Sequence, residues 1–153
     1  MTAAPNRGLA EPLGYAGLLP FLLGPLGAFG AGSVVHEAIA PGLVMWCLFY
    51  GAIILSFMAG GRWGLAVEKG EGGRLIPAVT PALIGWAALV PDTLLFGGSI
   101  SIQARLIVLI IAFAGLFAAE VRSGELPSWY QTLRLRLTTG VSILLGLTVL
   151  GVG

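Results

Sequence analysis

Residues 42–61 read GLVMWCLFYGAIILSFMAGG, twenty residues without one charged side chain. A helix that crosses the hydrocarbon core of a bilayer needs about 20 such residues, because the core is about 30 Å thick and each residue rises about 1.5 Å. The stretch therefore predicts a membrane-spanning helix, which we place at about residues 43–63.

The composition of the whole chain extends this interpretation. The 153 residues are 57% hydrophobic and only 10% charged, with a mean hydropathy of +0.96. These values exclude an ordinary soluble domain. A net charge of +1 provides no field that would attract nucleic acid, and the single cysteine, Cys47, excludes a disulfide framework. We expect one all-α polytopic membrane domain over residues 1–153.

Four further apolar segments bring the expected number of transmembrane helices to five. They lie at about residues 14–34, 75–91, 100–119 and 136–152. Pro20 and Pro25 predict a kink in the first span, and the third span is short. Residues 124–135 precede the last span and predict an amphipathic interfacial segment.

The basic residues indicate the orientation of the chain. With five spans, one side holds Arg7, Arg62, Lys69, Arg74, Arg122, Arg134 and Arg136, and the other side holds only Arg105. Loops on the cytoplasmic side are enriched in lysine and arginine. The pattern therefore predicts a cytoplasmic N-terminus and a periplasmic C-terminus.

Small residues recur at steps of four along the second span, at Ala52, Ser56, Gly60 and Gly64. Such a ridge lets two helix backbones approach closely in lipid, where packing drives association. We therefore expect these residues to form a contact surface between helices.

Arg62 and Trp63 follow at the expected inner boundary of the same span. Long cations reach the headgroups there and tryptophan occupies the aromatic belt, so we interpret both residues as interfacial anchors. The alternative is a lipid-headgroup or partner-subunit contact in which Arg62 acts together with Lys69 and Arg74.

Arg105 is the one clearly intramembrane charge, about five residues into its span. Such residues are candidates for function by default. We expect Arg105 to pair with Asp92, with Glu37 as the second choice. A structural clamp is favoured over an ion or proton path, because a relay needs several titratable groups at membrane depth.

Aromatic and basic residues mark the start of the last span. We expect Trp129 and Tyr130 at headgroup depth, and Arg134 and Arg136 at the inner end of the helix.

His36 is the only histidine and a weak candidate for ligating a cofactor. A transmembrane haem generally needs two axial ligands. We expect no cofactor and no metal, apart from contacts with lipid or pigment.

Catalytic motifs are absent from the sequence. It contains no Ser-His-Asp set, no HExxH, no paired carboxylates within one span and no nucleotide-binding fingerprint. We therefore expect a protein that is not an enzyme.

Three segments resemble a known family: LGYAGLLPFLLG at 13–24, ILSFMAGGRWGLAV at 54–67 and LPSWYQTLRLRLT at 126–138. The chain is similar in them to small multi-spanning proteins of bacterial and mitochondrial inner membranes related to transmembrane protein 69, a domain of unknown function. The resemblance implies a multi-pass location in a bacterial inner membrane, and it carries no activity or site.

Together these features favour an accessory, assembly or stabilising subunit of a larger membrane complex, respiratory or photosynthetic. The expected partners are membrane lipids and other integral membrane subunits, not nucleic acid. The alternative is a small transporter or channel that acts as an oligomer. The Pro20/Pro25 and Pro77/Pro81 pairs resemble the helix breaks that transporters carry at matching positions.

Overall fold

The computed structural model describes residues 7–95, 97–124 and 126–153, and all regular elements in these ranges are helices apart from one isolated bridge between Ala31 and Val35. Four helical segments within them are long and apolar enough to cross a membrane: Gly8–Gly30, Ala40–Glu68, Ile102–Ser123 and Ser128–Gly151. The all-α polytopic fold expected from the sequence is therefore confirmed.

The first span is a broken helix made of α1 (Arg7–Ala16), the 3₁₀ turn η1 (Leu19–Leu22) and α2 (Leu23–Gly30). Proline has no N–H, so Pro20 and Pro25 each leave the carbonyl four residues earlier without its helical partner. The expected kink is thus a full interruption. Helix α2 also stops at Gly30, so residues 31–34, expected within the span, lie in the loop before α3.

Helices α3 (Ala40–Glu68) and α4 (Leu75–Ala88) follow and run in opposite directions, with the 3₁₀ turn η2 (Gly72–Arg74) between them. The 29 residues of α3 extend about 43 Å, but the 14 residues of α4 extend only about 21 Å. The expected third span, 75–91, is shortened because Val90 precedes Pro91, and a residue before proline disfavours helix. A third 3₁₀ turn, η3 (Asp92–Leu94), follows.

Helix α5 (Ile102–Ser123) begins at a Ser101 cap whose hydroxyl accepts from the Ala104 N–H at 3.2 Å, and it ends at Gly124 with φ 65°. Helix α6 (Ser128–Gly151) then runs without interruption. In the segment expected to be amphipathic and interfacial, 124–135, residues 128–135 form the first two turns of this helix because no breaker follows Pro127, and residue 125 lies outside the described residues. The interfacial position of the segment stays a prediction.

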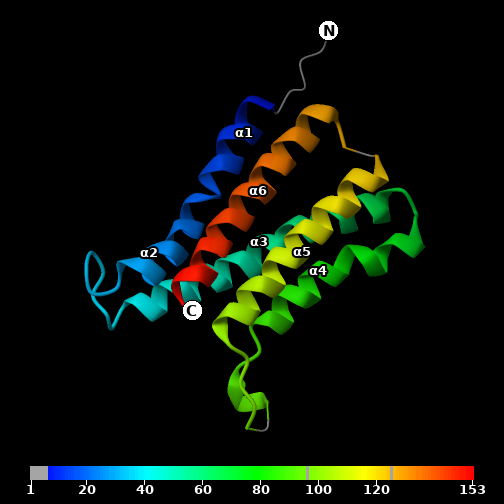
Figure 1. The fold of residues 1–153 in the computed structure, drawn as a ribbon. Helices are drawn as coiled ribbons and strands as arrows, with labels where there is room; N and C mark the ends of the chain where they lie inside the picture. The colour runs from blue at the N-terminus through cyan, green and yellow to red at the C-terminus, as the bar shows by residue number, and fades with distance from the viewer. Residues whose placement is uncertain (1–6, 96, 125) are drawn as a thin grey trace.

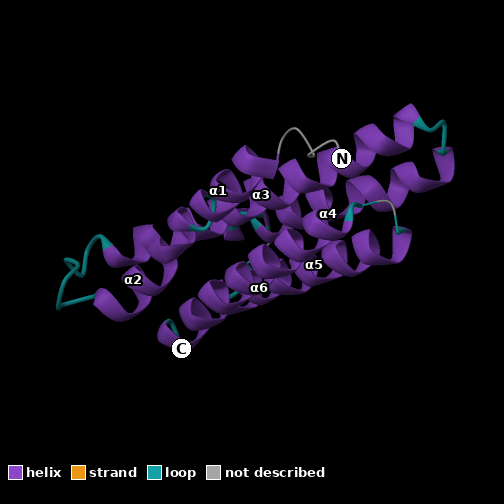
Figure 2. Ribbon diagram, turned by 90° about the horizontal axis from the view of Figure 1, so that it is seen from above, coloured by secondary structure: helices purple, strands orange, loops and turns teal. Residues whose placement is uncertain are grey.

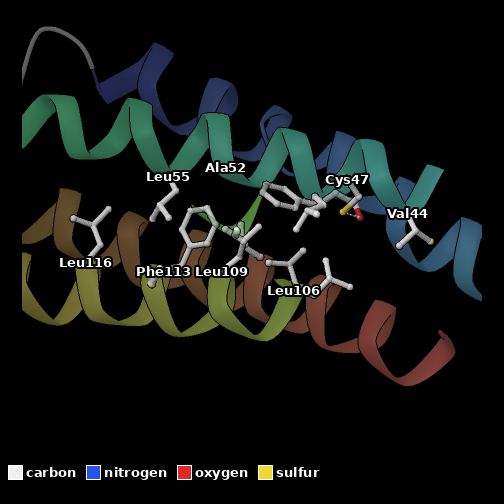
Figure 3. Packing of buried hydrophobic residues seen from close by; sticks show 14 residues of the cluster. Val44, Cys47, Ala52, Leu55, Leu106, Leu109, Phe113 and Leu116 are labelled. Atoms are coloured by element: carbon white, nitrogen blue, oxygen red, sulfur yellow. Dashed lines mark hydrogen bonds between the residues drawn. The ribbon is translucent and has the colours of Figure 1, made fainter. Parts of the chain in front are cut away.

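The helices form a ring in which α2, α3, α4, α5 and α6 each pack on the next and α6 closes on α2 (Figures 1 and 2). The broken helix α1–α2 and the helices α3, α4, α5 and α6 run in alternating directions, so the start of α1 and the C-terminus lie at opposite ends of the bundle. Apolar side chains of α3 and α5 fill the centre, among them Leu55, Leu109 and Phe113 (Figure 3).

Helix α3 supplies the polar groups that stabilise the broken span. The Tyr50 hydroxyl donates to the Gly17 carbonyl at 3.0 Å, and the Cys47 thiol donates to the Phe21 carbonyl at 3.6 Å. In a continuous helix the Phe21 carbonyl would accept a hydrogen bond from the N–H of residue 25, which Pro25 lacks. A neighbouring side chain thus satisfies the carbonyl that Pro25 frees, as a break inside a membrane requires.

Candidate functional site

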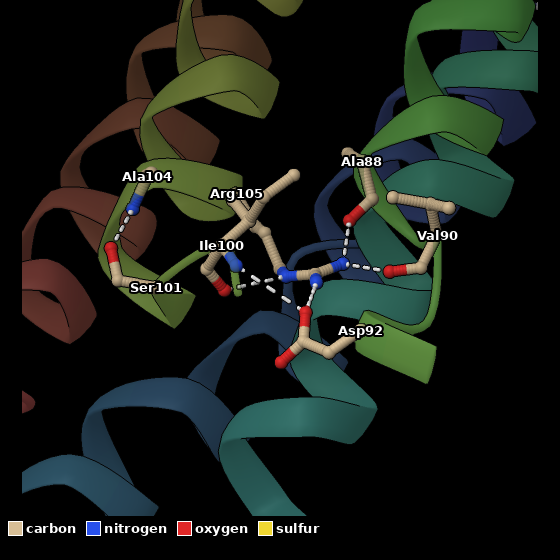
Figure 4. Close-up of polar contacts among 7 residues, drawn as sticks. All are labelled: Ala88, Val90, Asp92, Ile100, Ser101, Ala104 and Arg105. Atoms are coloured by element: carbon tan, nitrogen blue, oxygen red, sulfur yellow. Dashed lines mark hydrogen bonds and ion pairs between the residues drawn. The ribbon is translucent and has the colours of Figure 1, made fainter. Parts of the chain in front are cut away.

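Arg105 lies at the junction of α4 and α5 and uses all three of its guanidinium nitrogens (Figure 4). Nη2 donates to the Asp92 carboxylate at 2.6 Å, Nη1 donates to the carbonyls of Ala88 at 2.9 Å and Val90 at 2.6 Å, and Nε donates to the Ile100 carbonyl at 3.1 Å. The expected pair with Asp92 is therefore present. Its role as a clamp stays a prediction.

These contacts place a cation at the C-terminal end of α4, where carbonyls lack helical partners and the helix dipole is negative. The side chain of Arg105 is 9% exposed and that of Asp92 is 51% exposed. The arginine of this ion pair is therefore buried in the bundle, and the aspartate lies at the surface. Glu37, the second choice, lies in the exposed loop before α3, where its carboxylate approaches Gly32.

A second buried arginine lies towards the opposite end, between α5 and α6. Arg134 donates from Nε to Glu120 Oε2 at 2.8 Å and from Nη2 to Glu120 Oε1 at 3.0 Å. The two side chains are only 2% and 8% exposed. Nη1 reaches the Met58 sulfur at 2.9 Å. Arg134 was expected at the inner end of the last span, and its guanidinium turns inward there to a carboxylate.

Glu120 was missed, although helical periodicity carries a signal for it. Leu109, Phe113 and Leu116 form one buried stripe of α5, and a step of four from Leu116 reaches Glu120. Arg134 likewise continues the buried stripe of α6 through Thr138 and Val141. Two opposite charges on facing buried stripes predict a buried pair.

Arg62 lies close to this pair. Its Nε and Nη1 are shielded from solvent, yet neither has a hydrogen-bond partner among the described residues. Arg62 and Glu120 line one cavity of about 160 Å³, together with Met58, Gly61, Leu65, Ser123, Leu126 and Tyr130. Two guanidinium groups therefore lie near one carboxylate, and this excess positive charge suits an anion or another hydrogen-bond acceptor. Trp63 is half-exposed beside it.

A larger cavity, of about 360 Å³, lies on the other side of Met58 and Tyr130. It runs between α1, α3 and α6 down to Phe21, and its lining is mostly apolar. Arg134 and Thr138 are polar exceptions. We call this space the α1–α6 cavity.

Within this chain the small-residue ridge contacts a neighbouring helix only at its start. Ala52 is buried, and a Cβ added to Gly85 of α4 would lie 3.3 Å from the Ala52 carbonyl. Ser56 bonds back to the Ala52 carbonyl at 2.9 Å. Gly60 and Gly64, however, are exposed, and an added Cβ would meet nothing within 4 Å.

The geometry of the helix explains this difference. A step of four residues advances about 40° beyond a full turn, so Gly64 lies about 120° around the helix from Ala52. A step of seven falls short of two turns by only about 20°. Three of the small residues buried in α3 are accordingly spaced by seven: Ala52, Ala59 and Ala66.

The remaining candidates lie at the surface or near it. His36 is exposed, its Nδ1 accepts from the Ala38 N–H at 3.2 Å, and no group of three or more potential metal ligands occurs in the described ranges. The rings of Trp129 and Tyr130 meet edge to face at 5.5 Å. Arg136 is exposed and donates to the Tyr15 hydroxyl at 3.4 Å.

Comparison with known proteins shows the family of this chain. A family described as "Protein of unknown function (DUF3429)" matches residues 7–150. The chain belongs to this family. It is 33% identical over 131 residues to "Transmembrane protein 69" of Xenopus tropicalis, covering 82% of this chain and 47% of that protein. It is 26% identical over 133 residues to "Transmembrane protein 69" of Mus musculus, covering 78% of this chain and 46% of that protein.

The chain thus spans about half the length of the curated relatives that it matches. No solved structure matches it. The family and the membrane-protein character expected from the three sequence segments are therefore confirmed.

Proposed function

We propose that this protein is a non-enzymatic subunit of a larger complex in a bacterial inner membrane, where it packs against another integral membrane subunit. One observation carries the proposal. The outer face of α3 changes from bulky residues such as Trp46 and Phe57 to three glycines, Gly60, Gly61 and Gly64, at which an added Cβ would meet nothing within 4 Å.

Glycine in an exposed helix weakens the helix and exposes its backbone, at about 1 kcal/mol relative to alanine. In lipid this cost is offset where a second helix approaches the bare backbone. Arg62 lies within the glycine segment, and two of its nitrogens have no hydrogen-bond partner in the described part of the chain. A carbonyl or carboxylate of a partner helix would accept hydrogen bonds from them. The family relationship supports a role within the membrane.

Cross-linking from an introduced cysteine tests this proposal. The native Cys47 is fully buried, so a cysteine at Gly64 adds a single accessible thiol. Ile76→Cys is the control, because Ile76 is 75% exposed near the same end of the bundle on α4. The expected result is that Gly64→Cys, but not Ile76→Cys, cross-links in native membranes to a different membrane protein that also co-purifies stoichiometrically in mild detergent.

The alternative is a small transporter or channel that acts as an oligomer. The observation that favours it is the break at η1, because transporter sites are built at discontinuous helices and the α1–α6 cavity borders this break. Recovery of the chain as a homo-oligomer whose cross-links join only copies of itself would refute the subunit proposal and support the alternative.

A further inference from the structure

We propose that the α1–α6 cavity binds the acyl chain of a lipid, with the carboxyl or ester oxygen of that lipid accepting hydrogen bonds from Thr138 and Arg134. The inference does not rest on the subunit role proposed above. It starts from a hydroxyl group that the bundle leaves unsatisfied.

Thr138 is 7% exposed, and its Oγ1 has no hydrogen-bond partner in the part of the chain that the structure describes. Two other threonines of α6 behave differently. Thr132 donates to the Ser128 carbonyl at 3.1 Å, and Thr148 donates to the Leu144 carbonyl at 2.8 Å. A buried hydroxyl without a partner is costly, so a ligand in the cavity that Thr138 lines would supply what this hydroxyl lacks.

The neighbouring group is a second donor. Arg134 lines the same cavity one helical turn before Thr138, and among the described residues its Nη1 is bonded only to the Met58 sulfur. A thioether is a weak acceptor. An oxygen atom would be a better partner for this nitrogen, while Nε and Nη2 would keep their bonds to Glu120. A hydroxyl and a guanidinium N–H together favour a ligand with an acceptor oxygen.

The rest of the cavity favours an apolar chain next to that oxygen. Its lining is mostly apolar and includes Leu18, Phe21 and Val141 beyond Thr138. Leu13 of α1 and Phe57 of α3 line it from the two sides and are 68% and 77% exposed, so the cavity opens to the lipid between these helices. The unpartnered Arg62 beyond Met58 adds positive charge that attracts an acidic or ester head group.

The experiment measures lipid retention by the full chain in mild detergent, by native mass spectrometry. Deuterated palmitate and deuterated phosphatidylglycerol are added separately, which distinguishes a free carboxylate from a phospholipid ester. We expect one equivalent of one probe per chain. Thr138→Val, which keeps the shape and removes the hydroxyl, is expected to weaken binding about fivefold, as for one lost hydrogen bond.

Thr132→Val is the matched control, because Thr132 is exposed on the same helix and does not line the cavity. It is expected to bind like the wild type. Delipidated Thr138→Val is expected to unfold at the same temperature as the wild type or higher, since it loses only an unsatisfied hydroxyl. Equal lipid binding by both valine variants, or saturation by neither probe, would overturn the proposal.

Discussion

Glu120 and Arg134 face each other across the α5–α6 hairpin through two parallel hydrogen bonds, 2.8 Å from Nε to Oε2 and 3.0 Å from Nη2 to Oε1. Both side chains lie within the apolar bundle. Such bidentate geometry fixes two helices in one register. If a substitution removes one of the two charges, the other remains buried without a partner, which lowers the stability of the fold strongly.

We predict that Glu120→Leu lowers the free energy of unfolding in detergent by about 3–5 kcal/mol, because it leaves the buried guanidinium of Arg134 without its carboxylate. The double variant Glu120→Leu/Arg134→Met removes both charges and is expected to recover most of this loss. Chemical denaturation of the three proteins measures the effect. A double variant as unstable as the single one would contradict the assignment.

Arg105 leads to a different prediction, because its partners are mainly carbonyls. Arg105→Lys keeps the charge but cannot supply donors from three nitrogens in one plane. We expect it to lose about 2 kcal/mol or more of stability and to make the segment between α4 and α5 more sensitive to proteases. Arg122→Lys is the control, since Arg122 is exposed in the last turn of α5. Equal protease sensitivity of the two variants would contradict the role of Arg105 as a structural clamp.

The position of Gly24 tests the close packing of α2. An added Cβ would overlap Thr148 Oγ1 and lie 2.9 Å from the Cys47 sulfur. We predict that Gly24→Ala costs about 1–3 kcal/mol, as overpacking does. Adding Thr148→Ala should restore much of it by removing the clashing atoms.

Gly42→Ala serves as the control for this substitution, because an added Cβ would meet nothing within 4 Å there. It should be neutral or slightly stabilising, since alanine favours helix. Thermal unfolding in detergent compares the variants, and an equal effect at both glycines would contradict the packing of α2.

Hydropathy and charge predict much of this fold because both act locally. The apolar runs identify the passes through the bundle, and proline identifies the break near Pro20. The Arg105–Asp92 pair was also predictable, because a single charge in a span has few acids within reach.

Features that depend on which face of a helix is buried were harder to predict. The ridge from Ala52 to Gly64 follows a step of four residues, but the observed packing follows a step of seven. Arg134 lies near a helix end, where an arginine generally reaches the interface, and only the position of Glu120 on the buried stripe of α5 turns it inward. The end of α4 at Ala88 depended on Pro91, which lies beyond the helix itself.

Helix α4 decides whether the chain crosses the membrane four or five times, since its 14 residues are fewer than a span ordinarily needs. Gly72 and Ser99 flank it and are both exposed. Labelling of Gly72→Cys and Ser99→Cys in intact cells with a membrane-impermeant maleimide compares its two ends, and the wild-type chain with its buried Cys47 is the unlabelled control. The account predicts that Ser99→Cys is labelled from outside and Gly72→Cys only after the cells are opened; labelling of both from the same side would contradict the five-pass bundle.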